Sequence, residues 1–188
     1  MKRKVWSMEN VLVVEGEIIA SGMKCFLVNV YAPQDRYLEK AVWNFITNFM
    51  GANVGEYLVF GDFNVVRNQA ERSGYNFCQN EAEDFNNFII NSDLVDVPLE
   101  GRRFMRVDKL CLKMEKLDRF LVSNGILNSY PNLIGVVLAR LWSDHALTVL
   151  KEEHRDYGPI PFKLFHSWFL WTGLTSWCWM LGNGMMNL

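Results

Sequence analysis

Two short polar strings stand next to apolar runs in this sequence and carry groups that can do chemistry. Gly61-Asp62-Phe63-Asn64 follows an apolar run, and Ser143-Asp144-His145 precedes another. If Asp62 and Asn64 both continue a strand, their spacing places the two side chains on one side of the sheet, where they could act on the same substrate atom. Asp144 offers a ligand for a metal ion, and His145 can donate a hydrogen bond to a phosphoryl oxygen.

Each string also has a plainer structural interpretation. Gly61-Asp62-Phe63-Asn64 is typical of an Asx turn that closes a strand, and a lone Ser143-Asp144-His145 is typical of a loop. A third string, Leu117-Asp118-Arg119, favours a catalytic role for His145. A histidine needs a partner for its second ring nitrogen, and Asp118 would supply one. Sequence spacing alone does not bring these groups into one site.

The elements that must position these residues follow from hydrophobic periodicity. The pattern predicts strands broken by Glu15-Gly16-Glu17 and Ser21-Gly22, over Val11 to Val14, Ile18 to Ala20 and Cys25 to Tyr31. It predicts helices over Glu39 to Met50 and from a capping box of Asn80 and Glu83 to Ser92. Further strands are expected over Tyr57 to Phe60, Leu94 to Val97, Lys116 to Val122 and Ala146 to Leu150. Strands that arrive both in hairpins and next to helices predict an α/β sandwich with a mixed sheet.

Bulk properties narrow the function only a little. The chain has 188 residues, of which 50% are hydrophobic, and this suits one globular domain. A net charge of −2 gives no electrostatic footprint for nucleic acid, so a DNA-binding surface would have to be local. The densest basic stretch is Arg102, Arg103, Arg106, Lys109, Lys113 and Lys116, which a solvated loop explains equally well.

The cysteines and the apolar runs exclude two further classes. The four cysteines are scattered, without a CxxC pair, which predicts free thiols and no zinc site: Cys25, Cys78, Cys111 and Cys178. No apolar run is long enough for a membrane span, and no secretory leader is evident. We therefore expect no membrane partner.

Four blocks in a fixed order resemble the endonuclease/exonuclease/phosphatase family, and most closely its branch in plant LINE-type (non-LTR) retrotransposons. The blocks are Val28-Asn29-Val30-Tyr31-Ala32-Pro33, Gly61-Asp62-Phe63-Asn64, Leu117-Asp118-Arg119-Phe120 and Ser143-Asp144-His145. The resemblance covers about Val5 to Phe169. It implies a four-layer α/β sandwich of the DNase I-like type and metal-dependent phosphodiester hydrolysis.

The resemblance also implies a role for each matching residue. Asp62 would deprotonate the attacking water and contribute to the metal shell, and Asn64 would hold that water and a phosphate oxygen. Tyr31 would donate its hydroxyl to the phosphate, although an aromatic residue that merely closes a strand is the plainer interpretation. His145 would stabilise the phosphoryl charge while Asp118 fixes its tautomer, and Asp144 would complete the Mg²⁺ shell.

The chain also departs from the family pattern. Only thirty residues precede Tyr31, and the Asn-bearing and Glu-bearing strands that open the family's fold are not found among them. Met105-Arg106 follows Phe104 where the family usually has Thr-Trp. We therefore expect residues 1–169 to form a partial domain that lacks its first strands. Residues 170–188 are Trp-rich and uncharged, and a frameshifted, disordered tail explains them better than a membrane or partner anchor.

These observations predict a retrotransposon DNA endonuclease that is impaired by truncation, with Mg²⁺ weakly bound and Mn²⁺ able to replace it. Two alternatives stay open, a catalytically silent fragment and a phosphatase or phosphodiesterase for small molecules. DNA is the expected partner of an active domain, with no stable protein partner. A functional domain would be nuclear and not secreted.

Overall fold

The structure is a computed structural model that describes residues 4–74, 76–101, 104–107, 114–138 and 146–153. The chain divides into two units, Met1–His154 and Arg155–Leu188, and every described residue belongs to the first. The predicted domain boundary after Phe169 and the predicted tail 170–188 therefore lie outside the described residues.

The described residues form short helices and many strands. The helices are α1 (Arg36–Ala52), α2 (Gln79–Asn91), α3 (Asn124–Ser129) and the 3₁₀ turn η1 (Gln69–Glu71). The first strands are β1 (Val5–Ser7), β2 (Val11–Ile18), β3 (Met23–Tyr31), β4 (Glu56–Asp62), β5 (Arg72–Ser73) and β6 (Leu94–Asp96). The later strands are β7 (Leu99–Glu100), β8 (Arg106–Val107), β9 (Met114–Glu115), β10 (Asp118–Ser123), β11 (Leu133–Val137) and β12 (Thr148–Glu152).

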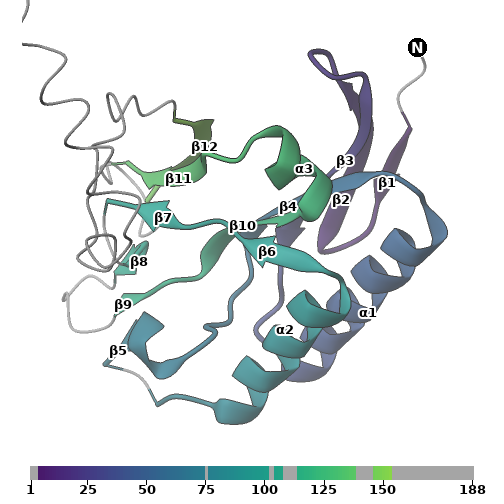
Figure 1. Cartoon of the computed structure of the whole chain (residues 1–188). Helices are drawn as coiled ribbons and strands as arrows, with labels where there is room; N and C mark the ends of the chain where they lie inside the picture. Colours follow the sequence, from purple (N-terminus) through teal and green to yellow (C-terminus); the bar gives the residue numbers. More distant parts are fainter. Residues whose placement is uncertain (1–3, 75, 102–103, 108–113, 139–145, 154–188) are drawn as a thin grey trace, which may run out of the picture. The chain divides into compact units, whose positions relative to one another are not determined.

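A six-stranded sheet in the order β1-β2-β3-β4-β10-β6 forms the centre of the domain. Its β3 and β4 are parallel and its other neighbours are antiparallel, so the sheet is mixed. Figure 1 shows α1 and α2 side by side on one face. The core under these helices includes Trp43 and Phe85 from the helices and Val28, Val59 and Leu121 from the strands.

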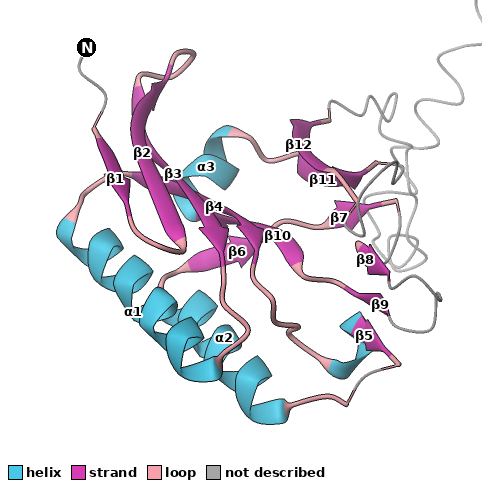
Figure 2. Ribbon diagram, turned by 180° about the vertical axis from the view of Figure 1, so that it is seen from behind, coloured by secondary structure: helices cyan, strands magenta, loops and turns pink. Residues whose placement is uncertain are grey.

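The opposite face of the sheet carries a second layer, visible from behind in Figure 2. Ile126 of α3 packs with Phe120 and Val122 of β10, together with Leu133 of β11 and Leu150 of β12. Strands β12, β11 and β7 form a separate three-stranded sheet, and β5, β9 and β8 form another. The predicted α/β fold with a mixed sheet is confirmed.

The first helix starts earlier than the sequence predicted because its cap lies upstream. The Asp35 carboxylate accepts hydrogen bonds from the backbone N–H groups of Tyr37 (2.9 Å) and Leu38 (3.2 Å). The predicted capping box of the second helix is wrong. Cys78 is the N-cap of α2, Asn80 lies inside the helix, and Glu83 accepts from the Gln79 side chain at 2.8 Å.

Two strand predictions need correction. Val11–Ile18 is one strand, because Glu15 and Gly16 stay paired with Phe26 and Cys25, and the turn comes only at Gly22, where φ is +68°. Residues 133–137 belong to none of the predicted elements but form β11. Gly135 allows this packing, because a Cβ there would lie 2.1 Å from the Leu99 side chain.

Free thiols were predicted for all four cysteines, and the structure describes two of them. Cys25 and Cys78 are free thiols, and the other two cysteines lie outside the described residues. Within the described part of the chain, no helix is long and apolar enough to cross a membrane.

Candidate active site

Three of the predicted site residues form one row across neighbouring strands. Tyr31, the last residue of β3, is paired with Asp62, the last residue of β4, and Asp62 is paired with Asp118, the first residue of β10. Directly paired residues project from the same face of a sheet, with Cβ atoms roughly 4.5–5.5 Å apart in an antiparallel pair. The row therefore presents a phenol and two carboxylates together at one end of the sheet.

This row lies on the face away from α1 and α2. Phe60 and Phe120, two residues along their strands from Asp62 and Asp118, belong to the core with α3 and β11. Because side chains alternate along a strand, Asp62 and Asp118 share that face. Both carboxylates are half-buried. Tyr31 is 68% exposed, so its ring covers little of the core.

The glycine before Asp62 makes the strand pairing possible. Gly61 has φ +131°, and a Cβ at this position would lie 2.0 Å from the Val30 carbonyl oxygen. No other residue fits there without moving a strand. Gly61 thus allows β3 and β4 to approach each other closely, one residue before the row begins.

Asn64 does not continue the strand, so the spacing argument for it was wrong. β4 ends at Asp62, and Asn64 has φ +52°. Its backbone N–H donates to the Asp62 side chain at 2.9 Å, which forms the Asx turn that was the plainer interpretation of this string. The Asn64 side-chain amide donates to the Ala32 carbonyl oxygen at 2.5 Å. The turn therefore ties Asn64 to Asp62 and to the end of β3.

The remaining predicted residues, Asp144 and His145, lie outside the described residues. The expected hydrogen bond between Asp118 and His145 and the metal role of Asp144 stay predictions. Among the residues that the structure describes, no group of three or more His, Cys, Asp or Glu side chains could hold a metal ion.

Only two members of the predicted basic stretch are described, and both form internal ion pairs. The Arg106 guanidinium lies 3.8 Å from Glu115, and the Lys116 ammonium lies 3.6 Å from Glu71. Arg102, Arg103, Lys109 and Lys113 lie outside the described residues.

Sequence reasoning missed a network of charges beneath the row, with a fully buried arginine at its centre. Arg119, directly after Asp118, has a side chain with 0% exposure and pairs with Glu71 and Asp96. Arg67, in the loop after Asn64, pairs with Asp96 at 3.1 Å. The available signal was an arginine within the predicted strand Lys116 to Val122, directly before the apolar run that starts at Phe120, because a charge in a buried strand requires partners.

A charged cavity of about 290 Å³ borders Asn64. Its lining residues include Glu39 of α1, Glu81 of α2 and the cross-strand row Arg72, Glu115 and Arg106. The side chain of Glu115 is only 5% exposed and lies 2.7 Å from Arg72. Burial, and then the negative charges of Glu81 and Asp84, raise the pKa of Glu39 to about 7.

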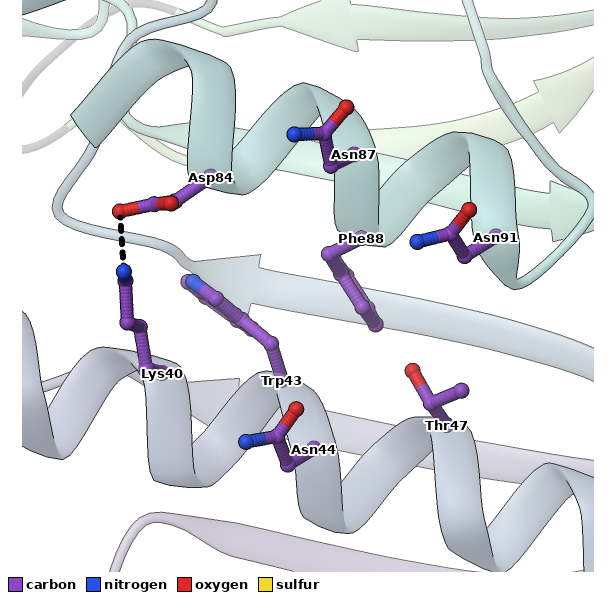
Figure 3. A pocket seen from close by; sticks show the side chains of 8 residues that line it. All are labelled: Lys40, Trp43, Asn44, Thr47, Asp84, Asn87, Phe88 and Asn91. Atoms are coloured by element: carbon purple, nitrogen blue, oxygen red, sulfur yellow. Dashed lines mark ion pairs between the residues drawn. The ribbon is translucent and has the colours of Figure 1, made fainter. Parts of the chain in front are cut away.

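A second hollow lies on the helix layer and not at the row. Figure 3 shows this groove of about 270 Å³ between α1 and α2, with the ion pair of Lys40 and Asp84 (3.0 Å) at one end. Trp43 and Phe88 stack at its floor, with ring centroids 4.9 Å apart. Asp62 and Asp118 face the other side of the sheet, so this groove is not part of the candidate site.

Several solved structures have a fold similar to that of this chain. The endonuclease domain of TRAS1, a telomere-specific non-LTR retrotransposon, matches with a TM-score of 0.58 and 14% identity, over 82% of this chain and 70% of that one. AP endonuclease LMAP from Leishmania major matches with a TM-score of 0.60 and 17% identity, over 78% and 55%. A 3′ phosphatase, NExo, from Neisseria, bound to a product DNA hairpin, matches with a TM-score of 0.57 and 21% identity, over 77% and 65%.

These likenesses define the fold and nothing finer. The chain spans 55% to 70% of the length of the three structures. A scan of protein-family models finds no match, and no curated protein shows significant sequence similarity. The fold is the DNase I-like mixed α/β fold of endonuclease/exonuclease/phosphatase proteins, as the four blocks implied.

Proposed function

We propose that this chain is the endonuclease domain of a plant LINE-type (non-LTR) retrotransposon, which hydrolyses phosphodiester bonds in DNA and acts in the nucleus. The observation that carries the proposal is the row of Tyr31, Asp62 and Asp118 at one end of the central sheet. The likeness to a retrotransposon endonuclease domain and to an AP endonuclease supports DNA as the substrate.

The donor set of this row suits a hard divalent cation. A cation held by Asp62 would also lower the electrostatic repulsion between the Asp62 carboxylate and the Asp118 carboxylate that is paired with it across the strands. Mg²⁺ prefers carboxylate and water oxygens and is commonly bound through only one or two carboxylates. When bound, the ion supplies positive charge to the phosphate oxygens. Asp62, and Asp144 from outside the described residues, would hold it, and we expect millimolar Mg²⁺ to be required.

The protein's own residues would do the remaining work. Asp62 would accept the proton of the attacking water, and Asn64 would donate its second amide N–H to a phosphate oxygen. Tyr31, which is exposed, would donate its hydroxyl to the phosphate. His145 would stabilise the charge that develops on the phosphoryl group, with Asp118 fixing its tautomer.

Nicking of supercoiled plasmid tests this proposal. We expect nicking in Mg²⁺ or Mn²⁺ that falls by about 10²–10³-fold in Asp62→Asn and Asp118→Asn, because each removes preorganised charge. Asp84→Asn is the matched control: it removes an aspartate that pairs with Arg36 and Lys40 on the helix layer, and nicking should not change. A folded protein that does not nick, or variants that nick as fast as the original, would contradict the proposal.

A second substrate distinguishes endonuclease activity from phosphatase activity on DNA. The likeness to a 3′ phosphatase favours a DNA hairpin with a 3′ phosphate as a competing substrate. A DNA endonuclease should release little phosphate from this hairpin while it nicks plasmid. The reverse result would assign phosphatase activity to the same row of residues.

A further inference from the structure

Arg119 is buried on the opposite face of the strand whose first residue is Asp118. Its side chain is fully buried, and its guanidinium lies 5.7 Å from the centre of the Phe85 ring of α2. It is paired in register with Gly61, which contributes no side chain of its own. Arg119 therefore lies directly beneath the end of the sheet that carries the candidate site.

The guanidinium of Arg119 joins three segments of the chain. Its Nη1 donates to Asp96 of β6 at 2.7 Å and to Glu71 at 3.2 Å. Its Nη2 donates to the other carboxylate oxygen of Glu71 and to the Lys116 carbonyl oxygen at 3.3 Å. The contact with Glu71 is therefore bidentate, which a planar guanidinium can form and an ammonium group cannot.

Glu71 in turn holds the loop that follows Asn64. Its carboxylate accepts from the backbone N–H of Arg67 at 2.7 Å, and its carbonyl oxygen accepts from the backbone N–H of Lys116 at 2.9 Å. Burial alone would raise the pKa of Glu71, but the hydrogen bond and charge of Arg119, together with the Arg67 backbone N–H and the charge of Lys116, hold the pKa below its ordinary value. Glu71 is thus a charged anchor between the loop and the start of β10.

Arg67 completes the connection to the helix layer. Its Nε donates to Asn86 of α2 at 2.8 Å, and the Asn86 side chain donates back to the Arg67 carbonyl oxygen at 3.0 Å. The loop from Asn64 to Glu71 is therefore fixed at both its backbone and its side chains.

The contribution of these charges to stability does not by itself explain the network. Nε of Arg119 and Oδ1 of Asp96 are buried and find no hydrogen-bond partner among the described residues. Apolar residues of similar volume commonly stabilise such a position as well as buried ions do. The charged groups fix the loop and the strand end through directional hydrogen bonds. Apolar packing would not impose the same geometry.

We propose that Arg119 is a positioning residue that sets the distance between Asp118 and the Asp62–Asn64 turn through Glu71. This inference rests on the proposed function, since the distance between Asp118 and the turn matters for catalysis only if both belong to an active site. The backbone carries the effect: the N–H of Phe63 donates to the Leu117 carbonyl oxygen at 3.0 Å, directly beside both site carboxylates.

Amide hydrogen exchange tests the positioning role without any need for activity. In Arg119→Lys we expect protection of the Phe63, Arg67 and Lys116 amides to fall about tenfold, with the β4–β10 amides at Val59 and Leu121 unchanged. Glu71→Gln, which keeps the side chain's size, should give the same pattern if Arg119→Lys does not fold. Arg36→Lys is the matched control, since Arg36 donates twice to Asp84 on the helix layer and should leave these amides unchanged.

The outcomes separate the two proposals. Protection that falls equally throughout the sheet, or nowhere, would show Arg119 to be only structural and would overturn the inference. If the unmodified protein nicks DNA, Arg119→Lys should lower kcat about tenfold or more while KM stays the same, since misplacement of catalytic groups affects the reacting step. If the unmodified protein does not nick, the proposed function fails, while the exchange pattern still decides whether Arg119 sets the geometry.

Discussion

The buried carboxyl of Glu39 gives the protein a dependence of stability on pH. Glu39 lies in the first turn of α1 and is 5% exposed. Burial raises its pKa from the ordinary 4.5 to about 7, with contributions from the negative charges of Glu81 and Asp84. Arg36 and Arg72 oppose this rise without cancelling it.

The sign of the effect follows from proton binding in the two states. Below pH 4.5 Glu39 is protonated in both the folded and the unfolded chain, so it adds nothing. As the pH rises from 4.5 to 7 only the unfolded chain loses this proton, so unfolding becomes more favourable. One pKa unit corresponds to about 1.4 kcal/mol, so the loss of stability reaches about 3 kcal/mol above pH 7 as an upper value.

Glu39→Gln should remove this loss while keeping the size of the side chain. We expect the variant to melt at nearly the same temperature as the original protein at pH 4.5, and about 5–10 °C higher at pH 8. Thermal unfolding followed by circular dichroism across this range measures the difference. Glu17→Gln, at an exposed position of β2, is the control and should show no such trend. A gain in Glu39→Gln that is the same at pH 4.5 and pH 8 would refute the reasoning.

Two further predictions concern the close approach of β3 and β4 at Gly61 and the exposed leucines of the sheet. Gly61→Ala should destabilise the protein by more than about 3 kcal/mol in chemical denaturation, because its Cβ meets the Val30 carbonyl oxygen. Gly51→Ala, where a Cβ meets nothing within 4 Å, should stabilise α1 by about 0.5–1 kcal/mol, and equal effects at the two sites would contradict this. Leu12 and Leu27 are 41% and 39% exposed on the face away from the helices, so the protein should bind the dye ANS. Replacing both by Gln should lower the dye fluorescence without lowering the melting temperature, and unchanged fluorescence would show that the dye binds elsewhere.

Much of the fold could be predicted from the sequence because its elements have clear periodicity. From Phe26 to Tyr31 the residues of β3 alternate between buried and exposed, and α1 places Val42, Trp43 and Ile46 on its buried face. Errors came where a polar or glycine residue suggested a break. Gly16 was read as a turn, but in the structure it pairs with Cys25 and a Cβ there would meet only the Cys25 sulfur, at 3.8 Å.

The site could be predicted only in part, because strand register is not visible in a sequence. The order of the four blocks named Tyr31, Asp62 and Asp118, and the sheet brings all three into one row. The spacing argument for Asn64 failed because the local hydrogen bond to Asp62 ended the strand two residues early. Sequence analysis did not single out Glu39, because the charges that raise its pKa, Glu81 and Asp84, belong to another helix.

Register also explains why Asp118 and Arg119 stand next to each other in the sequence. Successive side chains of a strand project from opposite faces, so Asp118 joins the row with Asp62 while Arg119 reaches the buried acids Glu71 and Asp96. A slip of one residue would place the guanidinium in the row and the carboxylate in the apolar core under the helices. Such a slip would remove the arginine that neutralises Glu71 and Asp96 and would bury an aspartate instead, which costs several kcal/mol. The buried arginine that positions the strand therefore also excludes the wrong register, and the same contact secures both the fold and the site.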